Sequence, residues 1–231
     1  MIIYHPTTPL EAVQLRKEHA DTAVYLAGGT DDLRLGGSAQ GKDLIDINGL
    51  GCDTIELQGD KLYIGARCTF QQLADSELVP DFIREAAGLC ASFVRRCSAT
   101  VGGNLGLRRS DSYLAAALTA AQAELDTVTP HGEEKMPVGE YLQGNCFRFI
   151  RGVVLDKGRT GRIKRFGNTV SSHAALIAAE SQGVYALSVQ GSPIVYGTSP
   201  DIAESAAYVD DLTGSAAYKK YLAKLVFTLG R

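Results

Sequence analysis

The pattern of apolar and polar positions divides the first half of the chain into short strands and helices. Short apolar runs bounded by turn residues predict three strands, at residues 23–27, 42–47 and 61–66. Thr8 followed by Pro9 predicts a helix before the first of these strands, because Thr caps a helix and Pro fits its first position. This order of elements predicts a small βαβ unit over residues 1–60.

Two further segments have helical patterns. Residues 80–94 repeat apolar side chains three and four positions apart, which predicts one amphipathic helix that ends in Arg95 and Arg96. We expect the two arginines to complement the partial negative charge of the helix C-terminus. Residues 112–123 are almost wholly small and apolar, which predicts a buried helix. Asp111 precedes this helix and is expected to cap it, the alternative being a ligand-facing role.

The remaining chain predicts mostly β-structure. Residues 124–155 alternate short apolar runs with turn signals. Residues 156–169 are basic and rich in glycine and predict a loop, which could be a solvated turn, a flexible lid or a phosphate contact. The C-terminal part predicts three strands and two helices, at residues 174–179, 184–189 and 194–196 and from Ser199 and Ser215.

Composition and charge favour a globular protein that binds no nucleic acid. The chain has 231 residues, of which 45% are hydrophobic, enough to bury a core. Its net charge of −3 comes from charges of both signs mixed along the chain, which predicts no basic surface for nucleic acid. No apolar run reaches the roughly 18 residues of a membrane helix, and the first residues lack a signal-peptide pattern. We therefore expect no membrane span and a cytoplasmic location.

The cysteines and histidines indicate neither a metal centre nor a catalytic group. The five cysteines are odd in number and contain no Cys-x-x-Cys pair, so reduced thiols are expected instead of a zinc or iron–sulfur site. The four histidines are scattered without a triad-like partner. These residues are Cys52, Cys68, Cys90, Cys97 and Cys146, and His5, His19, His131 and His173.

Two glycine pairs carry the candidate chemistry of the chain. Residues 26–30 (LAGGT) follow a predicted strand, and residues 99–105 (ATVGGNL) follow a predicted helix. Glycine allows positive φ and carries no Cβ, and successive backbone N–H groups in such turns form anion-binding nests. The carboxyl end of a strand in an α/β sheet is also where ligands bind. Two such nests predict a diphosphate group.

Neither glycine pair belongs to a common nucleotide motif. No Gly-x-Gly-x-x-Gly occurs in the chain. Residues 36–42 (GGSAQGK) match the glycine and lysine spacing of a P-loop. However, Asp43 stands where a P-loop has the Ser or Thr that holds magnesium, and the following residues predict a strand instead of a helix. We therefore expect no P-loop.

Four motifs resemble those of one family. Residues 26–31 (LAGGTD), 64–69 (IGARCT), 99–104 (ATVGGN) and 214–219 (GSAAYK) are similar to Leu-Ala-Gly-Gly-Thr-Asp, Ile-Gly-Ala-x-x-Thr, Ala-Thr-Ile-Gly-Gly-Asn and Gly-Ser-Ala-x-Tyr-Arg. These motifs are typical of the FAD-binding subunit of the molybdenum hydroxylases, the xanthine dehydrogenase and carbon monoxide dehydrogenase family. They occur in the same order over nearly the whole chain.

The chain departs from the family pattern at three places. Before Ala99-Thr100, this chain reads Arg96-Cys97-Ser98 where the family often has Arg-Asn-x, so Cys97 stands in place of the Asn. The segment between Asn104 and Asp111 is about two residues short, with Arg108-Arg109 in place of Ser-Pro. Asn168 stands where an arginine often follows a lysine, and the chain has no cysteine-rich insert for a further iron–sulfur cluster.

The resemblance implies an α+β fold: an FAD-binding fold of two α/β subdomains, PCMH-like, plus a C-terminal antiparallel three-stranded sheet with helices. The implied domains are residues 1–60, 61–165 and 166–231, with FAD between the first two.

The resemblance also implies where each part of FAD binds. The first glycine loop would hold the diphosphate, and the second would approach it from the other side. Ser110 and Asp111 would bond ribityl or ribose groups, Ala91 and Lys164 would lie near the flavin, and Ile150 would pack on an apolar part. The implied cofactor-binding residues are Leu26, Ala27, Gly28, Gly29, Thr30, Asp31, Asp32, Thr69, Ala91, Thr100, Gly102, Gly103, Asn104, Ser110, Asp111, Ile150 and Lys164. No catalytic residue and no metal ligand is expected, since the flavin supplies the redox chemistry.

The function implied by the resemblance is that of an electron-transfer subunit in a cytoplasmic heterotrimeric oxidoreductase. Electrons would pass from a molybdenum-cofactor subunit through the clusters of a [2Fe–2S] subunit to FAD, and then to NAD or another acceptor. Two alternatives stay open. One is a flavin-free interaction subunit, suggested by the short segment between Asn104 and Asp111. The other is a stand-alone FAD-dependent oxidoreductase, for which the chain has no obvious substrate domain or flavin-linking histidine.

Overall fold

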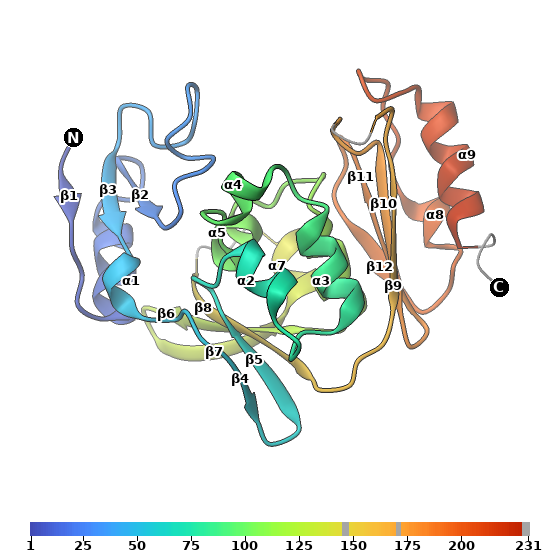
Figure 1. Ribbon diagram of the computed structural model, residues 1–231. Helices are drawn as coiled ribbons and strands as arrows, with labels where there is room; N and C mark the ends of the chain where they lie inside the picture. Colours follow the sequence, from blue (N-terminus) through green and yellow to red (C-terminus); the bar gives the residue numbers. More distant parts are fainter. Residues whose placement is uncertain (145–147, 170–171, 228–231) are drawn as a thin grey trace.

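Three neighbouring lobes, each built around its own sheet, make up the chain (Figure 1). The computed structural model describes residues 1–144, 148–169 and 172–227. The N-terminal and C-terminal lobes lie on opposite sides of the middle lobe, whose helices occupy the space between them. The predicted α+β fold class is confirmed.

The N-terminal lobe is a parallel sheet with strand order β1-β3-β2. Its elements are β1 (Ile3–Tyr4), α1 (Pro9–Glu18), β2 (Ala23–Leu26), β3 (Asp43–Asp46) and the 3-10 turn η1 (Asn48–Leu50). The predicted start of α1 is confirmed, because Thr8 Oγ1 accepts the Glu11 N–H at 3.2 Å. Val13 and Ile45 pack with Phe149 of the middle lobe, so the two lobes share a small core.

The link between β2 and β3 is a series of turns. Gly36 and Gly41 adopt φ of +74°, and residues 36–42 lead directly into β3. A P-loop lysine would instead begin a helix. The structure therefore confirms that residues 36–42 are not a P-loop.

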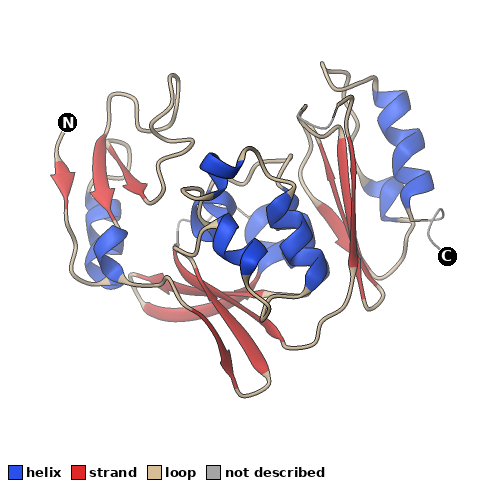
Figure 2. Ribbon diagram, viewed as in Figure 1, coloured by secondary structure: helices blue, strands red, loops and turns tan. Residues whose placement is uncertain are grey.

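The middle lobe is an antiparallel sheet with strand order β4-β5-β8-β6-β7. Helices cover one of its faces (Figure 2). The strands are β4 (Ile55–Gln58), β5 (Lys61–Gly65), β6 (Glu124–Thr129), β7 (Gly132–Pro137) and β8 (Phe149–Asp156). The helices are α2 (Phe70–Asp75), α3 (Asp81–Gly88), α4 (Phe93–Arg96), α5 (Val101–Gly106), α6 (Tyr113–Ala120) and α7 (Val138–Gln143). As predicted, α6 is buried, and it forms the centre of the largest hydrophobic core.

The single helix predicted over residues 80–94 is wrong, because the chain breaks between α3 and α4. Ala91 adopts a φ of +51°, and Ser92 Oγ accepts the Arg95 N–H at 3.4 Å to start α4. The Arg96 guanidinium donates to the Gly88 and Ala91 carbonyls at 3.3 and 3.2 Å. Arg96 therefore complements the C-terminal end of α3, as expected. The apolar residues continue at helical spacing through this break, but the Ser92 cap starts a separate helix.

The C-terminal lobe is an antiparallel sheet with strand order β12-β11-β10-β9. It packs on α3 and α6 on one side and on α8 and α9 on the other. Its elements are β9 (Arg162–Phe166), β10 (Leu176–Ser181), β11 (Val184–Val189), β12 (Val195–Gly197), α8 (Ile202–Ser205) and α9 (Ala216–Val226). The sheet has four strands instead of the predicted three, because β9 lies in the segment predicted as a loop. The basic residues of this segment do not show the apolar pattern of a strand. β9 forms because it pairs with β10, with Ile163 opposite Ala179.

Strand pairing divides the chain slightly differently from the predicted domains. β4 precedes the predicted boundary at residue 60 but pairs with β5 of the middle lobe. β9 begins before the predicted boundary at residue 165, crosses it, and pairs with β10 of the C-terminal lobe. The division into three domains stays a prediction, and these pairings favour earlier boundaries.

The sequence predicts reduced cysteine thiols and no membrane-spanning helix, and the structure provides one observation on each. Cys52, Cys68, Cys90 and Cys97 are free, whereas Cys146 lies outside the described residues. Burial raises the pKa of the Cys68 thiol to about 11, which keeps it protonated. Among the helices of the described residues, none combines the length and apolar character that a membrane crossing requires.

Candidate functional site

The two glycine stretches lie against each other. A Cβ on Gly28, in the loop after β2, would be 1.7 Å from the Ser98 carbonyl oxygen and 3.5 Å from Thr100 Cγ2. Only a residue without a side chain permits this approach. Two segments from different lobes therefore meet at backbone distance.

The first glycine stretch forms an open turn at the carboxyl end of β2. The Leu33 N–H donates to the Gly29 carbonyl at 3.1 Å, and Gly29 adopts a φ of +65°. Within the described part of the chain, the N–H groups of residues 28–32 have no protein acceptor. Consecutive N–H groups held in one turn form an anion-binding nest. This turn can therefore bind a phosphate group.

The second glycine stretch differs from the prediction, because it is the first turn of α5. Thr100 Oγ1 accepts the Gly103 N–H at 3.2 Å, and the Gly102 N–H donates to the Ala66 carbonyl at 2.7 Å. A Cβ on Gly102 would lie 2.8 Å from Ala66 Cβ. The glycines of the second stretch allow close packing against Ala66. The prediction of two equivalent nests is therefore wrong: the structure has one open turn next to the capped start of a helix.

Thr69, the N-cap residue of α2, supports this arrangement. It forms an isolated antiparallel bridge with Thr100, and its side chain caps α2 by accepting the Gln72 N–H at 3.2 Å. The Gln72 side chain accepts the Thr69 N–H at 2.7 Å in return. This capping box fixes the backbone of Thr69, which pairs with Thr100.

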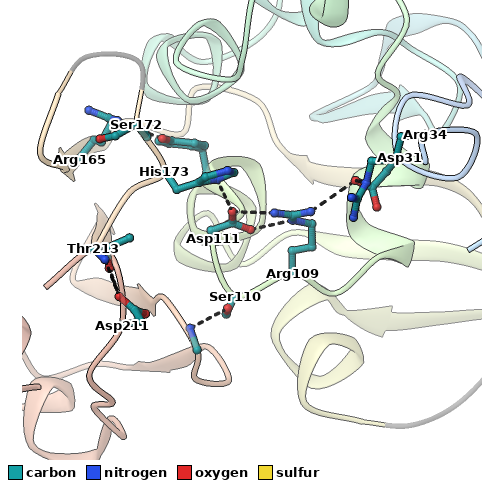
Figure 3. Close-up of polar contacts among 12 residues, drawn as sticks. Asp31, Arg34, Arg109, Ser110, Asp111, Arg165, Ser172, His173, Asp211 and Thr213 are labelled. Carbon is teal, nitrogen blue, oxygen red and sulfur yellow. Dashed lines mark hydrogen bonds and ion pairs between the residues drawn. The ribbon is translucent and has the colours of Figure 1, made fainter. Parts of the chain in front are cut away.

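Ionic contacts connect the open turn to both other lobes (Figure 3). Arg109, in the loop between α5 and α6, donates to Asp31 Oδ1 at 3.4 Å through Nη1. The same guanidinium makes two hydrogen bonds to Asp111, at 2.8 and 2.9 Å. Asp111 Oδ2 also lies 3.1 Å from His173 Nδ1 of the C-terminal lobe. The row Asp31, Arg109, Asp111 and His173 thus crosses all three lobes.

Asp111 does not cap α6, so that expectation is wrong. Ser112 is the cap, since its Oγ accepts the Ala115 N–H at 3.1 Å. Burial by itself would raise the pKa of Asp111, but the hydrogen bonds and charges of Arg109 and His173 outweigh it and hold the pKa below its usual value.

The lowered pKa predicts a pH-dependent contribution of Asp111 to stability. The contribution is present above the pKa of an unfolded aspartate, about 3.9, and is lost as the pH falls through the lower folded value. At pH 7 we expect Asp111→Asn to be less stable by about 1–2 kcal/mol, because a charge-assisted pair is lost. Thermal unfolding from pH 7 to pH 3 should show this difference shrinking in acid. A constant difference would contradict the assignment.

The other polar residues implied for the cofactor have partners inside the protein. Asn104 Oδ1 accepts the Ser112 hydroxyl at 2.6 Å, and Ser110 Oγ accepts the Gly191 N–H at 3.1 Å. Asp32 accepts a hydrogen bond from the Ser38 hydroxyl. These contacts hold the loops around the open turn.

The apolar and distal members of the implied set are placed differently. Leu26 ends β2, and the Ala27 carbonyl accepts from Asn48 Nδ2 at 3.2 Å. Ala91 lies in the positive-φ turn before α4, and Ile150 is buried in β8 within the main core. Lys164, on β9, lines a small hollow together with Val226 and Phe227 of the C-terminal lobe. The structure does not bring Lys164 to the open turn.

Two arginines next to the open turn are missing from the implied set. Arg95 Nη2 donates to the Thr30 carbonyl at 2.6 Å, although it was expected to serve only its own helix end. Arg109 reaches Asp31 and stands where the family pattern has a different residue. The only sequence signal was the position of both arginines beside the second glycine stretch.

The chemistry of this region fits the diphosphate of FAD. The open N–H groups of residues 28–32 supply donors, and Arg95 and Arg109 supply positive charge next to them. Within the described residues, no group of three or more side chains suits a metal ion. A surface hollow of about 640 Å³ lies on the outer face of the middle sheet, where Arg151 pairs with Asp126 and Glu133.

The chain is similar in sequence to one protein family and to a bacterial protein. The family described as FAD binding domain in molybdopterin dehydrogenase matches residues 1–155. The uncharacterized protein YgfM of Escherichia coli K12 is 27% identical over 237 residues, covering 95% of this chain and 90% of that protein.

Solved structures with the same fold include CO dehydrogenases and a quinoline oxidoreductase. A cyanide-inactivated Cu,Mo-CO dehydrogenase has a TM-score of 0.83 at 21% identity, covering 97% of this chain and 94% of its own. The carbon monoxide dehydrogenase of Hydrogenophaga pseudoflava has a TM-score of 0.83 at 22% identity, covering 97% and 93%. Quinoline 2-oxidoreductase of Pseudomonas putida 86 has a TM-score of 0.82 at 16% identity, covering 98% and 93%.

The family match includes both glycine stretches and the loop that carries Arg109 and Asp111. The open turn and its neighbouring positive charges agree with the cofactor that the family binds. This chain therefore belongs to the family of FAD-binding domains in molybdopterin dehydrogenases.

Proposed function

We propose that this chain is the FAD-binding electron-transfer subunit of a multi-subunit molybdenum-containing dehydrogenase or hydroxylase. The observation that carries the proposal is the open turn at residues 28–32, packed against the second glycine stretch in a member of an FAD-binding family. Bound FAD supplies the redox chemistry, and the protein supplies binding, orientation and electrostatics.

The residues of the chain have distinct proposed roles toward FAD. The N–H groups of residues 28–32 bind the diphosphate, with the Thr30 hydroxyl as a further donor. Thr100, Gly102 and Gly103 keep the middle lobe close to this turn. Ser110 and Asp111 provide polar groups for the sugar-like parts of the cofactor. No residue of the chain is proposed as a catalytic acid, base or nucleophile.

The proposed partners are a [2Fe–2S] subunit and a molybdenum-cofactor subunit in the cytoplasm. Electrons would reach FAD from the iron–sulfur clusters and leave to NAD or another acceptor. Support comes from the similar structures, which are described as CO dehydrogenases and a quinoline oxidoreductase.

The visible absorption spectrum tests the proposal. We expect the chain, alone or assembled with its partners, to take up FAD and show the flavin bands. Uptake is measured after incubation with FAD and removal of free cofactor on a desalting column. A chain that stays colourless both alone and in its complex would contradict the proposal.

A flavin-free interaction subunit is the second candidate. It is favoured by one observation: Asn104, Ser110 and Asp111 already have protein partners. This candidate predicts a complex with the partner subunits that forms normally but lacks flavin absorption from this chain. The same spectrum of the assembled complex therefore distinguishes the two functions.

A further inference from the structure

The loop between α5 and α6 connects separate parts of the molecule through consecutive side chains. Arg108 lies 4.2 Å from the centroid of the Tyr141 ring and donates to the Gly144 carbonyl at 2.6 Å. Arg109 reaches the N-terminal lobe, and Ser110 accepts from Gly191 in the C-terminal lobe. A backbone φ of +48° at Arg108 lets neighbouring side chains point in different directions. This loop is therefore the point at which the three lobes meet.

The Arg109 guanidinium is held in one orientation. Its two hydrogen bonds to Asp111 are bidentate, a geometry that fixes the plane of the group. The remaining nitrogen, Nη1, points to Asp31 Oδ1 at 3.4 Å. The Arg109 side chain is 36% exposed and those of Asp31 and Asp111 are 18% and 10% exposed, so solvent screens this group only in part.

Asp31 lies within the open turn, and its negative charge opposes the binding of an anionic ligand there. Its carboxylate belongs to the same residues 28–32 whose N–H groups have no acceptor within the described part of the chain. A phosphate bound there would be repelled by a carboxylate without a counter-charge. Arg34 supplies a positive charge from the same loop, and Arg109 supplies one from the other lobe. The same contact also ties the open turn to the loop between α5 and α6.

We propose that Arg109 is a positioning residue for FAD. Through its bonds to Asp31 and Asp111, Arg109 holds the open turn against the loop between α5 and α6, a contact that we call the clasp. The clasp determines how slowly FAD dissociates. This inference rests on the proposed function, because FAD is the ligand whose release is measured. It assigns a role to a residue that the four family-like motifs do not include.

Arg34 provides a matched control within the chain. Its Nε donates to Asp31 Oδ1 at 2.9 Å, closer than Arg109 does, but Arg34 belongs to the same loop as Asp31. Arg34→Gln therefore removes a guanidinium from Asp31 without breaking a contact between lobes. Arg109→Gln removes both the charge and the contact. A comparison of the two variants separates the clasp from a local charge effect.

Release of FAD is followed by flavin fluorescence after dilution of the loaded protein. We expect Arg109→Gln to release FAD at least tenfold faster than the unsubstituted chain, and Arg34→Gln to stay within about twofold. Arg109→Lys should resemble Arg109→Gln, because lysine keeps the charge but cannot form the bidentate pair and reach Asp31 together. Equal acceleration by Arg34→Gln, or no acceleration by Arg109→Gln, would overturn the proposal.

A double-mutant cycle in the ligand-free protein tests the clasp without FAD. The cycle combines Asp31→Asn with Arg109→Gln and measures thermal unfolding of all four proteins. If the clasp exists, Asp31→Asn destabilises the chain less when Arg109 is already absent. Additive effects would overturn the clasp, whether or not FAD binds. Failure of the unsubstituted chain to take up FAD would instead overturn the proposed function, and with it the role toward FAD, while a non-additive cycle would still show the contact.

Discussion

Gly28→Ala is expected to abolish FAD retention and to lower the free energy of unfolding by about 2–3 kcal/mol. The added Cβ would lie 1.7 Å from the Ser98 carbonyl oxygen, which is backbone and cannot rotate away. The loop after β2 must therefore move from the segment before α5, which separates the open turn from the second glycine stretch. Flavin absorbance after desalting and urea denaturation measure the two effects.

Gly106→Ala is the control for this substitution. Gly106 ends α5, has no heavy atom within 4 Å of an added Cβ and does not adopt positive φ. Alanine there should leave both FAD retention and stability close to those of the unsubstituted chain. If Gly28→Ala retained FAD and stability as well as Gly106→Ala does, the two glycine stretches would not pack as the structure shows.

Asp211→Ala is expected to produce the second large effect, a loss of about 3–5 kcal/mol in the free energy of unfolding. Lys219 of α9 is fully buried, and its Nζ donates to Asp211 Oδ2 at 2.6 Å. Its other acceptors are the carbonyls of Val209 and Gln190, at 3.0 and 3.4 Å. Removal of the carboxylate leaves a buried ammonium without a counter-charge. Urea denaturation at pH 7 measures the loss.

Lys219→Met separates the cost of the unpaired charge from the loss of a contact. Methionine fills a similar volume without a charge, and Asp211, whose side chain is 27% exposed, can be hydrated. We therefore expect Lys219→Met to be less destabilising than Asp211→Ala, and the double variant to recover part of the loss. The pair is wrongly assigned if Asp211→Ala is the milder of the two.

The buried pair also explains one of the family-like motifs. Residues 214–219 resemble a motif found near the end of FAD-binding subunits, but their roles in this structure concern folding. Ser215 Oγ accepts the Tyr218 N–H at 3.2 Å and starts α9, and Lys219 joins two loops of the C-terminal lobe. One of these loops contains Gly191, which contacts Ser110. The motif therefore acts on the proposed site only through the position of that loop.

Local patterns in the sequence determined several elements and the family of the chain. The cap at Thr8, the strand before the first glycine stretch and the buried α6 depend on side chains a few residues apart, which a sequence shows directly. The glycine motifs were enough to indicate an FAD-binding family, because they occur in a fixed order. The family match over residues 1–155 confirms that identification.

The tertiary structure decided the features that depend on distant partners. β9 becomes a strand only by pairing with β10, and the N–H groups of Val101 and Gly102 at the start of α5 find acceptors on Cys68 and Ala66, which follow β5. Asp111 could equally cap a helix by its position, but Arg109 and His173 give it a different role. Local sequence shows which conformations a segment prefers, whereas hydrogen bonds and ion pairs between lobes depend on how the whole chain packs. Only the tertiary structure could therefore show that the first glycine stretch is an open turn and the second is a capped helix start.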